Sequence, residues 1–143
     1  MISEFKGEYR WLSNFAPAKV ILDGIEYPTI ENAYQAAKTL DLERRKEFLN
    51  IGPGHAKRLG KTLELREGWN LMKYNIMKDL QKQKYDQLEY HNLLMSTGSF
   101  QEIQEGNLWN DIYWGVCLTT GEGKNYLGKI IMEIRTEKWF PLL

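Results

Sequence analysis

The sequence contains few of the residues on which disulfide and metal chemistry depend. Its 143 residues include one cysteine, Cys117, and two histidines, His55 and His91. A single cysteine cannot form an intramolecular disulfide, and these three side chains are too few for the usual four-ligand zinc site. We therefore expect no disulfide framework and no metal site. Cys117 lies in an apolar run, which favours a place in the core over the role of a nucleophile.

Long apolar runs and an excess of one charge are also missing. No apolar stretch approaches the ~18 residues of a membrane-spanning helix, and residues 1–4 do not resemble the start of a secretion signal. Lys plus Arg (19) equals Asp plus Glu (19), which argues against general binding to nucleic acids or anionic membranes. The sequence motifs of serine hydrolases, zinc peptidases and P-loop nucleoside triphosphatases do not occur. We therefore expect a cytoplasmic protein without a membrane partner.

Aromatic residues, by contrast, are frequent. Five Trp, eight Tyr and five Phe make up 13% of a chain in which 27% of the residues are charged. An aromatic core would explain this frequency, and so would a pocket that stacks on a flat ligand. Several aromatics alternate with polar residues, as Tyr34 does between Glu31 and Lys38. This alternation favours the pocket.

The length and the order of the predicted elements indicate a single α+β domain over residues 1–143. No repeat or linker divides the chain, and its length is usual for one domain. Asp23-Gly24 between two apolar segments predicts a hairpin with a type I′ turn, and Thr29 can cap the helix that follows. The predicted elements are a short strand and loop within 5–15, a hairpin over 20–27, helices over 30–40, 41–50, 55–59 (closed by Gly60), 67–83 and 86–98 (opened by an Asp86/Glu89 capping box), a strand over 112–118, and a last helix capped by Asn125.

The helix predicted after Thr29 carries the first candidate site. Glu31, Gln35 and Lys38 are spaced i, i+4 and i+7, which places them on one helix face beside Tyr34. A carboxylate, an amide and an amine on one wall could hold the hydroxyls of a sugar and assist cleavage of a glycosidic bond. The alternative is a solvated stripe of surface charges.

The second candidate site is the segment from Glu105 to Gly115. Two carboxylates, Glu105 and Asp111, alternate there with Trp109 and Trp114. Burial among aromatic rings is one way in which the pKa of an acid or base is tuned. The alternative is a loop whose tryptophans fill the core while Asp111 forms an Asx turn.

Two weaker signals concern anions. Gly121–Asn125 precedes a predicted helix, whose N-terminus could meet an anion, although such turns usually only reverse the chain. His55, Lys57, Arg58 and Lys61 form the only local basic group. We expect this group to be a solvated face, with phosphate binding as the alternative.

Several segments, taken in order, resemble the NADAR/YbiA-like family. They are Trp11–Phe15, Tyr27–Lys38, Trp69 with Met72, Glu105–Gly115 and Gly123–Arg135. Each match is weak alone, but the ordered set covers residues 4–136. The resemblance implies a compact, mostly helical α+β domain with a few short strands, the YbiA-like fold.

The resemblance also implies an enzyme that hydrolyses an N-glycosidic bond at C1 of a phosphorylated ribose, without a cofactor or metal. Two substrates are associated with the family. One is a ribosylamino-pyrimidine phosphate of the riboflavin pathway, and the other is ADP-ribose on a guanine base, so that nucleic acid would enter only as a modified substrate. The alternative is a non-catalytic module that binds NAD, ADP-ribose or a nucleotide.

The matching motif positions supply the expected site residues. Glu31, Lys38 and Asp111 are the expected catalytic residues. One carboxylate would stabilise the oxocarbenium-like transition state and the other would activate water, in either order. Lys38 would either bind phosphate or donate a proton as an ammonium, or attack C1 as a neutral amine and form a Schiff base, which we favour.

The expected substrate-binding residues are more numerous. They are Asn14, Phe15, Tyr34, Gln35, Trp69, Glu105, Trp109, Trp114, Asn125 and Arg135. For each of the three tryptophans, stacking on the base and burial in the core remain alternatives. For Arg135 the partner is either a phosphate or a carboxylate of a neighbouring helix.

Overall fold

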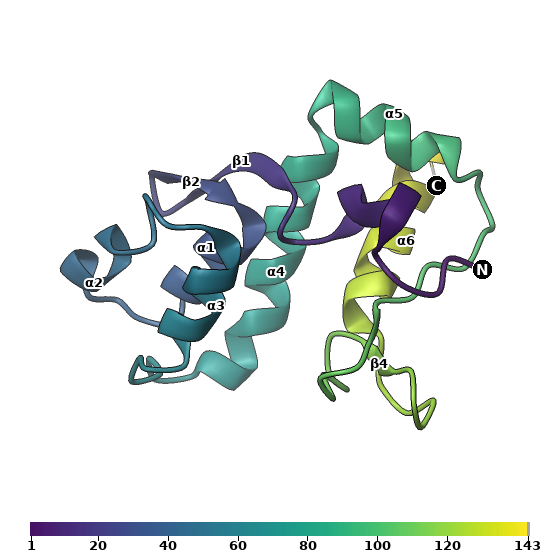
Figure 1. Ribbon diagram of the computed structural model, residues 1–143. Helices are drawn as coiled ribbons and strands as arrows, with labels where there is room; N and C mark the ends of the chain where they lie inside the picture. The colour runs from purple at the N-terminus through teal and green to yellow at the C-terminus, as the bar shows by residue number, and fades with distance from the viewer. Residues whose placement is uncertain (143) are drawn as a thin grey trace. The chain divides into compact units, whose positions relative to one another are not determined.

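The computed structural model describes residues 1–142 and divides the chain into two compact units (Figure 1). The central unit is Asn14–Lys84, and the terminal unit joins Met1–Ser13 to Tyr85–Leu143. That the whole chain is one domain stays a prediction.

The described residues form seven helices and four short strands, which confirms the mostly helical α+β class. In the central unit these are β1 (Pro17–Leu22), β2 (Ile25–Thr29), α1 (Ile30–Ala36), α2 (Leu42–Lys46), α3 (Pro53–Gly60) and α4 (Trp69–Tyr85), whose last residue belongs to the terminal unit. In the terminal unit they are η1 (Gly7–Leu12), α5 (Leu88–Ser96), β3 (Gly106–Asn107), β4 (Val116–Cys117) and α6 (Tyr126–Trp139). No helix within residues 1–142 is both long and apolar enough to cross a membrane.

The hairpin forms where the sequence predicts it. Asp23 and Gly24 have φ angles of 49° and 81°, as a type I′ turn requires. Val20 faces Tyr27 across the antiparallel pair. β2 runs through Pro28 to Thr29 rather than stopping before it. Because β2 pairs on one side only, a residue without an N–H is tolerated there.

α1 begins at the predicted cap but is shorter than predicted. The Thr29 hydroxyl accepts a 3.1 Å hydrogen bond from the Asn32 N–H, and the helix ends at Ala36 instead of Leu40. All seven of its residues are buried. The polar face that carries Glu31 therefore lies inside the unit and is not a solvated stripe.

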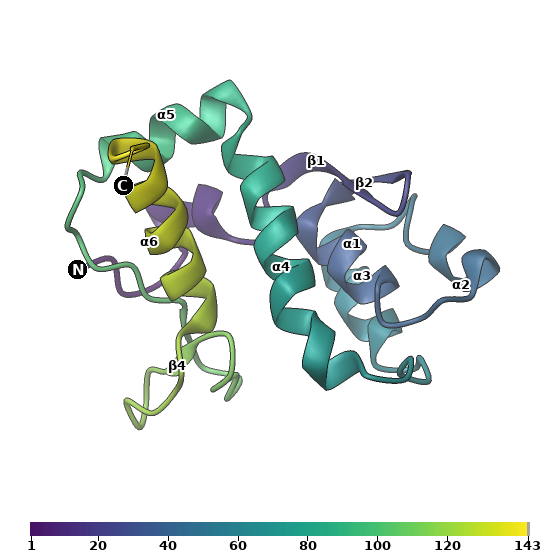
Figure 2. The same ribbon diagram turned by 180° about the vertical axis from the view of Figure 1, so that it is seen from behind.

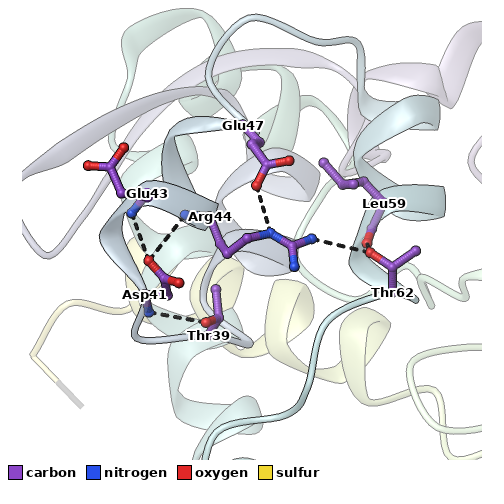
Figure 3. A network of polar contacts seen from close by, with 7 residues as sticks. All are labelled: Thr39, Asp41, Glu43, Arg44, Glu47, Leu59 and Thr62. Atoms are coloured by element: carbon purple, nitrogen blue, oxygen red, sulfur yellow. Dashed lines mark hydrogen bonds and ion pairs between the residues drawn. The ribbon is translucent and has the colours of Figure 1, made fainter.

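α2 covers only part of the helix predicted over 41–50. Asp41 caps it and accepts hydrogen bonds from the Glu43 and Arg44 N–H groups, as Figure 3 shows. The same view shows Arg44 reaching Glu47 and the Thr62 hydroxyl, which ties α2 to the segment after α3. Beyond α2, the Phe48 and Ile51 carbonyls accept hydrogen bonds from the Asn32 side chain. These carbonyls are therefore bonded to a side chain of α1 and not within a continued α2.

α3 and α4 begin and end near their predicted bounds. α3 starts at Pro53, a residue suited to the first helical turn, and it includes Gly60, which the sequence predicts just beyond its end. In Figure 1 and Figure 2, α3 runs beside α1 below the hairpin. A Cβ at position 60 would lie 2.7 Å from Gln35 Cδ and still closer to its Oε1. This glycine therefore permits the close approach of the two helices.

The terminal unit departs further from the predicted elements. Residues 7–12 form a 3₁₀ helix instead of a strand, and Ile2 makes an isolated parallel bridge with Ile103. The capping box predicted before α5 is wrong: the N-cap is Gln87, whose side chain makes no capping hydrogen bond, and Asp86 pairs with Lys138 at 3.0 Å. This ion pair links the last turn of α6 to the segment before α5, and Figure 2 shows the end of α6 near α5.

The strand predicted over 112–118 is reduced to β4, which pairs in parallel with β3. Cys117 lies in β4 and is buried, as the sequence indicates. Most of the predicted strand is instead a loop that contributes the second group of site residues.

Candidate functional site

The predicted site residues fall into two groups, one in each unit, and the first centres on Glu31. This side chain is 7% exposed, and Gln35 is 5% exposed one helical turn later. Gln35 Nε2 donates a 2.9 Å hydrogen bond to Glu31 Oε1. A buried carboxylate is thus held in a fixed direction by an amide from its own helix.

Lys38 lies two residues beyond the end of α1, near the ring of Tyr34, which itself contacts that of Trp69. Its Nζ is 5.9 Å from the centre of the Tyr34 ring, and the Tyr34 and Trp69 rings are 5.3 Å apart. The Lys38 carbonyl accepts a 2.8 Å hydrogen bond from the Arg66 N–H. The backbone of this half-buried lysine is therefore fixed although it is outside a helix.

The surroundings of Lys38 lower the pKa of its amine from the usual 10.5. Burial is the largest cause, and the Glu31 carboxylate acts in the opposite direction. The ammonium groups of Lys73, Lys61 and Lys57 lower the pKa further. Consequently the neutral, nucleophilic form of Lys38 is more populated than that of an ordinary surface lysine.

Asn14 connects the first turn of α1 to α4. Its backbone carbonyl accepts a 3.1 Å hydrogen bond from the Glu31 N–H. Its side-chain oxygen accepts one of 2.6 Å from Gln81 Nε2, and its amide donates to the Met77 sulfur. Phe15, the next predicted residue, is 38% exposed.

Gln81 and Gly60 are two residues that the sequence reasoning missed. Gln81 is fully buried and lies one turn after Met77, on the face that the predicted helix turns to the core. A glutamine on an apolar face was the available signal, because buried polar groups are normally hydrogen-bonded. Gly60 gave no signal, because its role depends on the approach of Gln35 from another helix.

The second group lies in the terminal unit, and its centre is the loop between β3 and β4. Asn107, which is 1% exposed, donates to Glu105 Oε2 and to the Asp111 carbonyl, both at 3.0 Å. Asp111 Oδ1 accepts hydrogen bonds from the Tyr113 and Trp114 N–H groups. Asp111 therefore forms the Asx turn that the sequence offered as an alternative, and one of its oxygens is used in it.

The two tryptophans of this loop differ in exposure. Trp109 is 54% exposed, so it is not a core residue. Trp114 is half-buried, and its ring meets that of Tyr113 edge-on at 4.7 Å. Tyr113 makes a second edge-on contact with Tyr126 at the start of α6.

Gly115 allows the Glu105 carboxylate to lie directly against the loop backbone. A Cβ at this position would collide with Glu105 Oε2 and would lie 2.7 Å from Asn107 Nδ2. The Asn107 amide donates to the Glu105 carboxylate and to the backbone carbonyl of Asp111, and so links the positions of the two acidic residues.

Asn125 and Arg135 contact the protein's own groups. Asn125 adopts a left-handed conformation and does not cap α6 with its side chain, which accepts from the Glu105 N–H and donates to the Ile103 carbonyl. The N–H groups of residues 125–127 donate to loop carbonyls. Arg135 is 2% exposed and donates to Thr97 Oγ1 at 2.9 Å and to the Gln101 carbonyl at 2.6 Å. Their roles in substrate binding stay predictions.

Within residues 1–142 no group of three or more His, Cys, Asp or Glu side chains is arranged to hold a metal ion. The site chemistry available from the described residues is that of carboxylates, an amine of lowered pKa, amides and aromatic rings.

Comparison with known proteins gives a consistent result. The model of the NADAR domain matches residues 3–139. N-glycosidase YbiA of Escherichia coli (strain K12) is 34% identical over 134 residues, which are 91% of this chain and 82% of that protein. N-glycosidase Npun_R5314 of Nostoc punctiforme is 31% identical, over 90% of this chain and 85% of its own length.

A third relative, the chloroplastic riboflavin biosynthesis protein PYRR of Zea mays, is 28% identical over 87% of this chain, and the match covers 23% of that protein. Among solved structures, the NMR structure of E. coli YbiA superimposes with a TM-score of 0.83 and 33% identity, over 98% of this chain and 84% of that one.

Proposed function

This chain belongs to the NADAR family, within which it is an enzyme related to the N-glycosidase YbiA, and we propose that it hydrolyses an N-glycosidic bond at C1 of a phosphorylated ribose. The observation that carries the proposal is the arrangement around α1. The buried carboxylate of Glu31 accepts a hydrogen bond from Gln35 and interacts electrostatically with the amine of Lys38. A carboxylate and an amine so placed are suited to a carbon that becomes electron-poor during the reaction.

Relatives favour one of the two substrate classes. A relative named a riboflavin biosynthesis protein supports a ribosylamino-pyrimidine phosphate as the substrate. ADP-ribose on a guanine base presents the same chemistry at C1, since the leaving group is again an exocyclic amine. Measuring which product is released, as described below, distinguishes these two substrates.

We assign Lys38 the role of nucleophile. In the ring-opened substrate, its neutral amine would attack C1 and displace the amine of the base, which leaves with a proton. Water would then hydrolyse the Lys38 imine and release the sugar phosphate and the free amine of Lys38. Burial and the three neighbouring ammonium groups, which lower the pKa of Lys38, support this assignment.

Glu31 and Asp111 are the proposed carboxylates of the reaction. Glu31, whose carboxylate interacts electrostatically with the Lys38 amine, would stabilise the developing positive charge at C1. Asp111, matched through the family motif, would activate water. Replacing Lys38, Glu31 or Asp111 by alanine should each lower the rate at least about 100-fold, and full activity in all three variants would refute the assignment.

Reductive trapping tests the imine directly. Incubation with substrate and borohydride should leave a sugar-phosphate adduct on Lys38, detected by peptide mass spectrometry. Lys38→Arg keeps the charge without the nucleophile and should give no adduct. If the wild-type protein cleaves the substrate but is not trapped, the imine is wrong and Lys38 acts as an ammonium, which binds phosphate or donates a proton.

The activity itself is tested by product release. The protein is incubated with a ribosylamino-pyrimidine phosphate and, separately, with DNA that carries ADP-ribosylated guanine. Release of ribose 5-phosphate or of ADP-ribose is measured. Binding without release of either product would favour the non-catalytic module.

A further inference from the structure

The C-terminal end of α3 brings two lysines, Lys57 and Lys61, to the region of Lys38. Lys57 lies in the last turn of α3, and Lys61, four residues later, is its C-cap residue in a helical conformation, so the two lie on the same side of this helix end. Gly60, between them, lies against the Gln35 side chain of α1. This end of α3 therefore approaches α1 one turn before Lys38.

α4 brings a third lysine from another direction. Lys73 follows Trp69 by one helical turn and shares its face. The Trp69 ring lies 5.3 Å from the ring of Tyr34, and Lys38 Nζ lies 5.9 Å from that ring. Lys73 and Lys38 are thus on the same side of the central unit.

Around Lys38, neighbouring positive charges outnumber negative ones. The charged groups that act on it are one carboxylate, Glu31, and the ammonium groups of Lys73, Lys61 and Lys57. We call these three residues the lysine cluster. Lys57 and Lys73 are half-buried and Lys61 is exposed, so all three side chains reach solvent in part.

We propose that the lysine cluster of Lys57, Lys61 and Lys73 binds the phosphate of the sugar-phosphate substrate, while Glu31 and Lys38 act at C1. This inference rests on the proposed function for the identity of the sugar. A phosphate monoester carries about −1.5 to −2 charges at neutral pH, and lysine is a usual phosphate ligand in the form of a point charge. The diphosphate of ADP-ribose offers the same chemistry, so the two ligands are separate arms of the test.

The test is a binding measurement that needs no turnover. Isothermal titration calorimetry with ribose 5-phosphate, ADP-ribose and unphosphorylated ribose is carried out on the wild-type protein and on Lys61→Met, Lys61→Glu and Lys73→Met. Lys82→Met is the matched control, because Lys82 is an exposed lysine on α4 outside the cluster. Thermal unfolding of each variant confirms that it is folded.

Each cluster variant should weaken the binding of the phosphorylated ligand about 10-fold, as expected for loss of a partly exposed charged hydrogen bond. Lys61→Glu should weaken it more, and the effect should shrink at high salt. Lys82→Met should bind like the wild type. Preference for ribose 5-phosphate or for ADP-ribose identifies which phosphate the cluster holds.

Two outcomes would overturn the inference. One is an affinity for both phosphorylated ligands that stays within twofold of wild type in folded Lys61→Glu and Lys73→Met. The other is an equal loss in Lys82→Met, which would mean a nonspecific charge effect. If the cluster binds phosphate but no glycoside is cleaved, the proposed function fails and the phosphate site stands. If glycoside is cleaved with the same KM in the cluster variants, the phosphate site fails alone.

Discussion

Replacing Gly60 by alanine tests whether Gln35 must hold Glu31 for the enzyme to work. The added Cβ would lie 2.7 Å from Gln35 Cδ and 3.1 Å from Gln35 Cβ, and closest of all to the amide oxygen. Carbon atoms in contact are normally ~3.5–4.0 Å apart. The amide of Gln35 therefore has to move away, and we expect it to lose its 2.9 Å hydrogen bond to Glu31.

The energies of this substitution have opposite signs. Alanine is favoured over glycine inside a helix by about 1 kcal/mol. Against this stand the loss of a hydrogen bond to a carboxylate, about 1.5–3 kcal/mol, and overpacking of about 1–3 kcal/mol. The clash therefore outweighs the helix propensity, and we expect a net destabilisation of about 2–5 kcal/mol. For a protein of this length the melting temperature should fall by roughly 5–15 °C.

Activity should fall as well, because Glu31 loses the group that fixes its direction. A displacement of about 1 Å at a catalytic group can lower the rate on the order of 100-fold, so kcat for glycoside cleavage should drop by about 10–100-fold. The assays are thermal unfolding and steady-state release of the sugar phosphate, measured on the same preparations.

Gly54→Ala is the matched control in the same helix. A Cβ at position 54 would have Arg58 Nη1 as its nearest neighbour, at 3.7 Å, an ordinary contact. This variant should gain about 0.5–1 kcal/mol and keep full activity. Wild-type stability and kcat in Gly60→Ala, or equal losses in both variants, would refute the reasoning. In a Gln35→Ala background Gly60→Ala should add little, because the group that it displaces is gone.

Other side chains give independent tests. Burial lowers the pKa of Lys84 from 10.5 to about 7, so between about pH 7 and 10.5 the unfolded chain binds a proton that the folded chain lacks. Stability should then rise with pH by up to about 1.4 kcal/mol per unit, and a rise that persists in Lys84→Met in urea titrations would contradict this. Trp109→Ala should raise KM without changing the melting temperature, whereas Trp69→Ala, at a ring 5% exposed, should cost about 3–5 kcal/mol; equal melting temperatures would contradict the contrast. Gln81→Met removes the hydrogen bond from Gln81 to the Asn14 side chain and should lower kcat with little change in KM. An unchanged kcat would show that Asn14 does not need this bond to keep its contact with the Glu31 N–H.

The parts of the fold that the sequence predicts are those fixed by neighbouring residues. Asp23-Gly24 sets the turn because both residues tolerate positive φ, whatever surrounds them. Thr29 caps α1 through an N–H three residues away. The strand predicted over 112–118 is mostly loop because its conformation depends on distant partners, such as the carbonyls that accept from residues 125–127. A short apolar run carries no information about such partners.

The candidate site was predictable to the same extent. Helical spacing correctly grouped Glu31 with Gln35, which are hydrogen-bonded. It placed Lys38 on the same helix, although α1 ends at Ala36 and Lys38 is fixed by the Arg66 N–H instead. That the polar face of α1 is buried follows from the packing of α3, which depends on Gly60. No local pattern shows that contact.

The neutral charge of the whole chain and the local charge around Lys38 have different consequences. Equal numbers of acidic and basic residues disfavour general binding to polyanions, but they allow three lysines to gather beside a fourth. The lysine cluster lowers the pKa of Lys38, and a phosphate bound to the cluster would oppose this effect with charge of the other sign. By linkage, protonation of Lys38 must strengthen phosphate binding by the same factor. The neutral amine is therefore most populated in the free enzyme, and burial, the largest cause of the lowered pKa, has to keep part of it neutral once the substrate is bound.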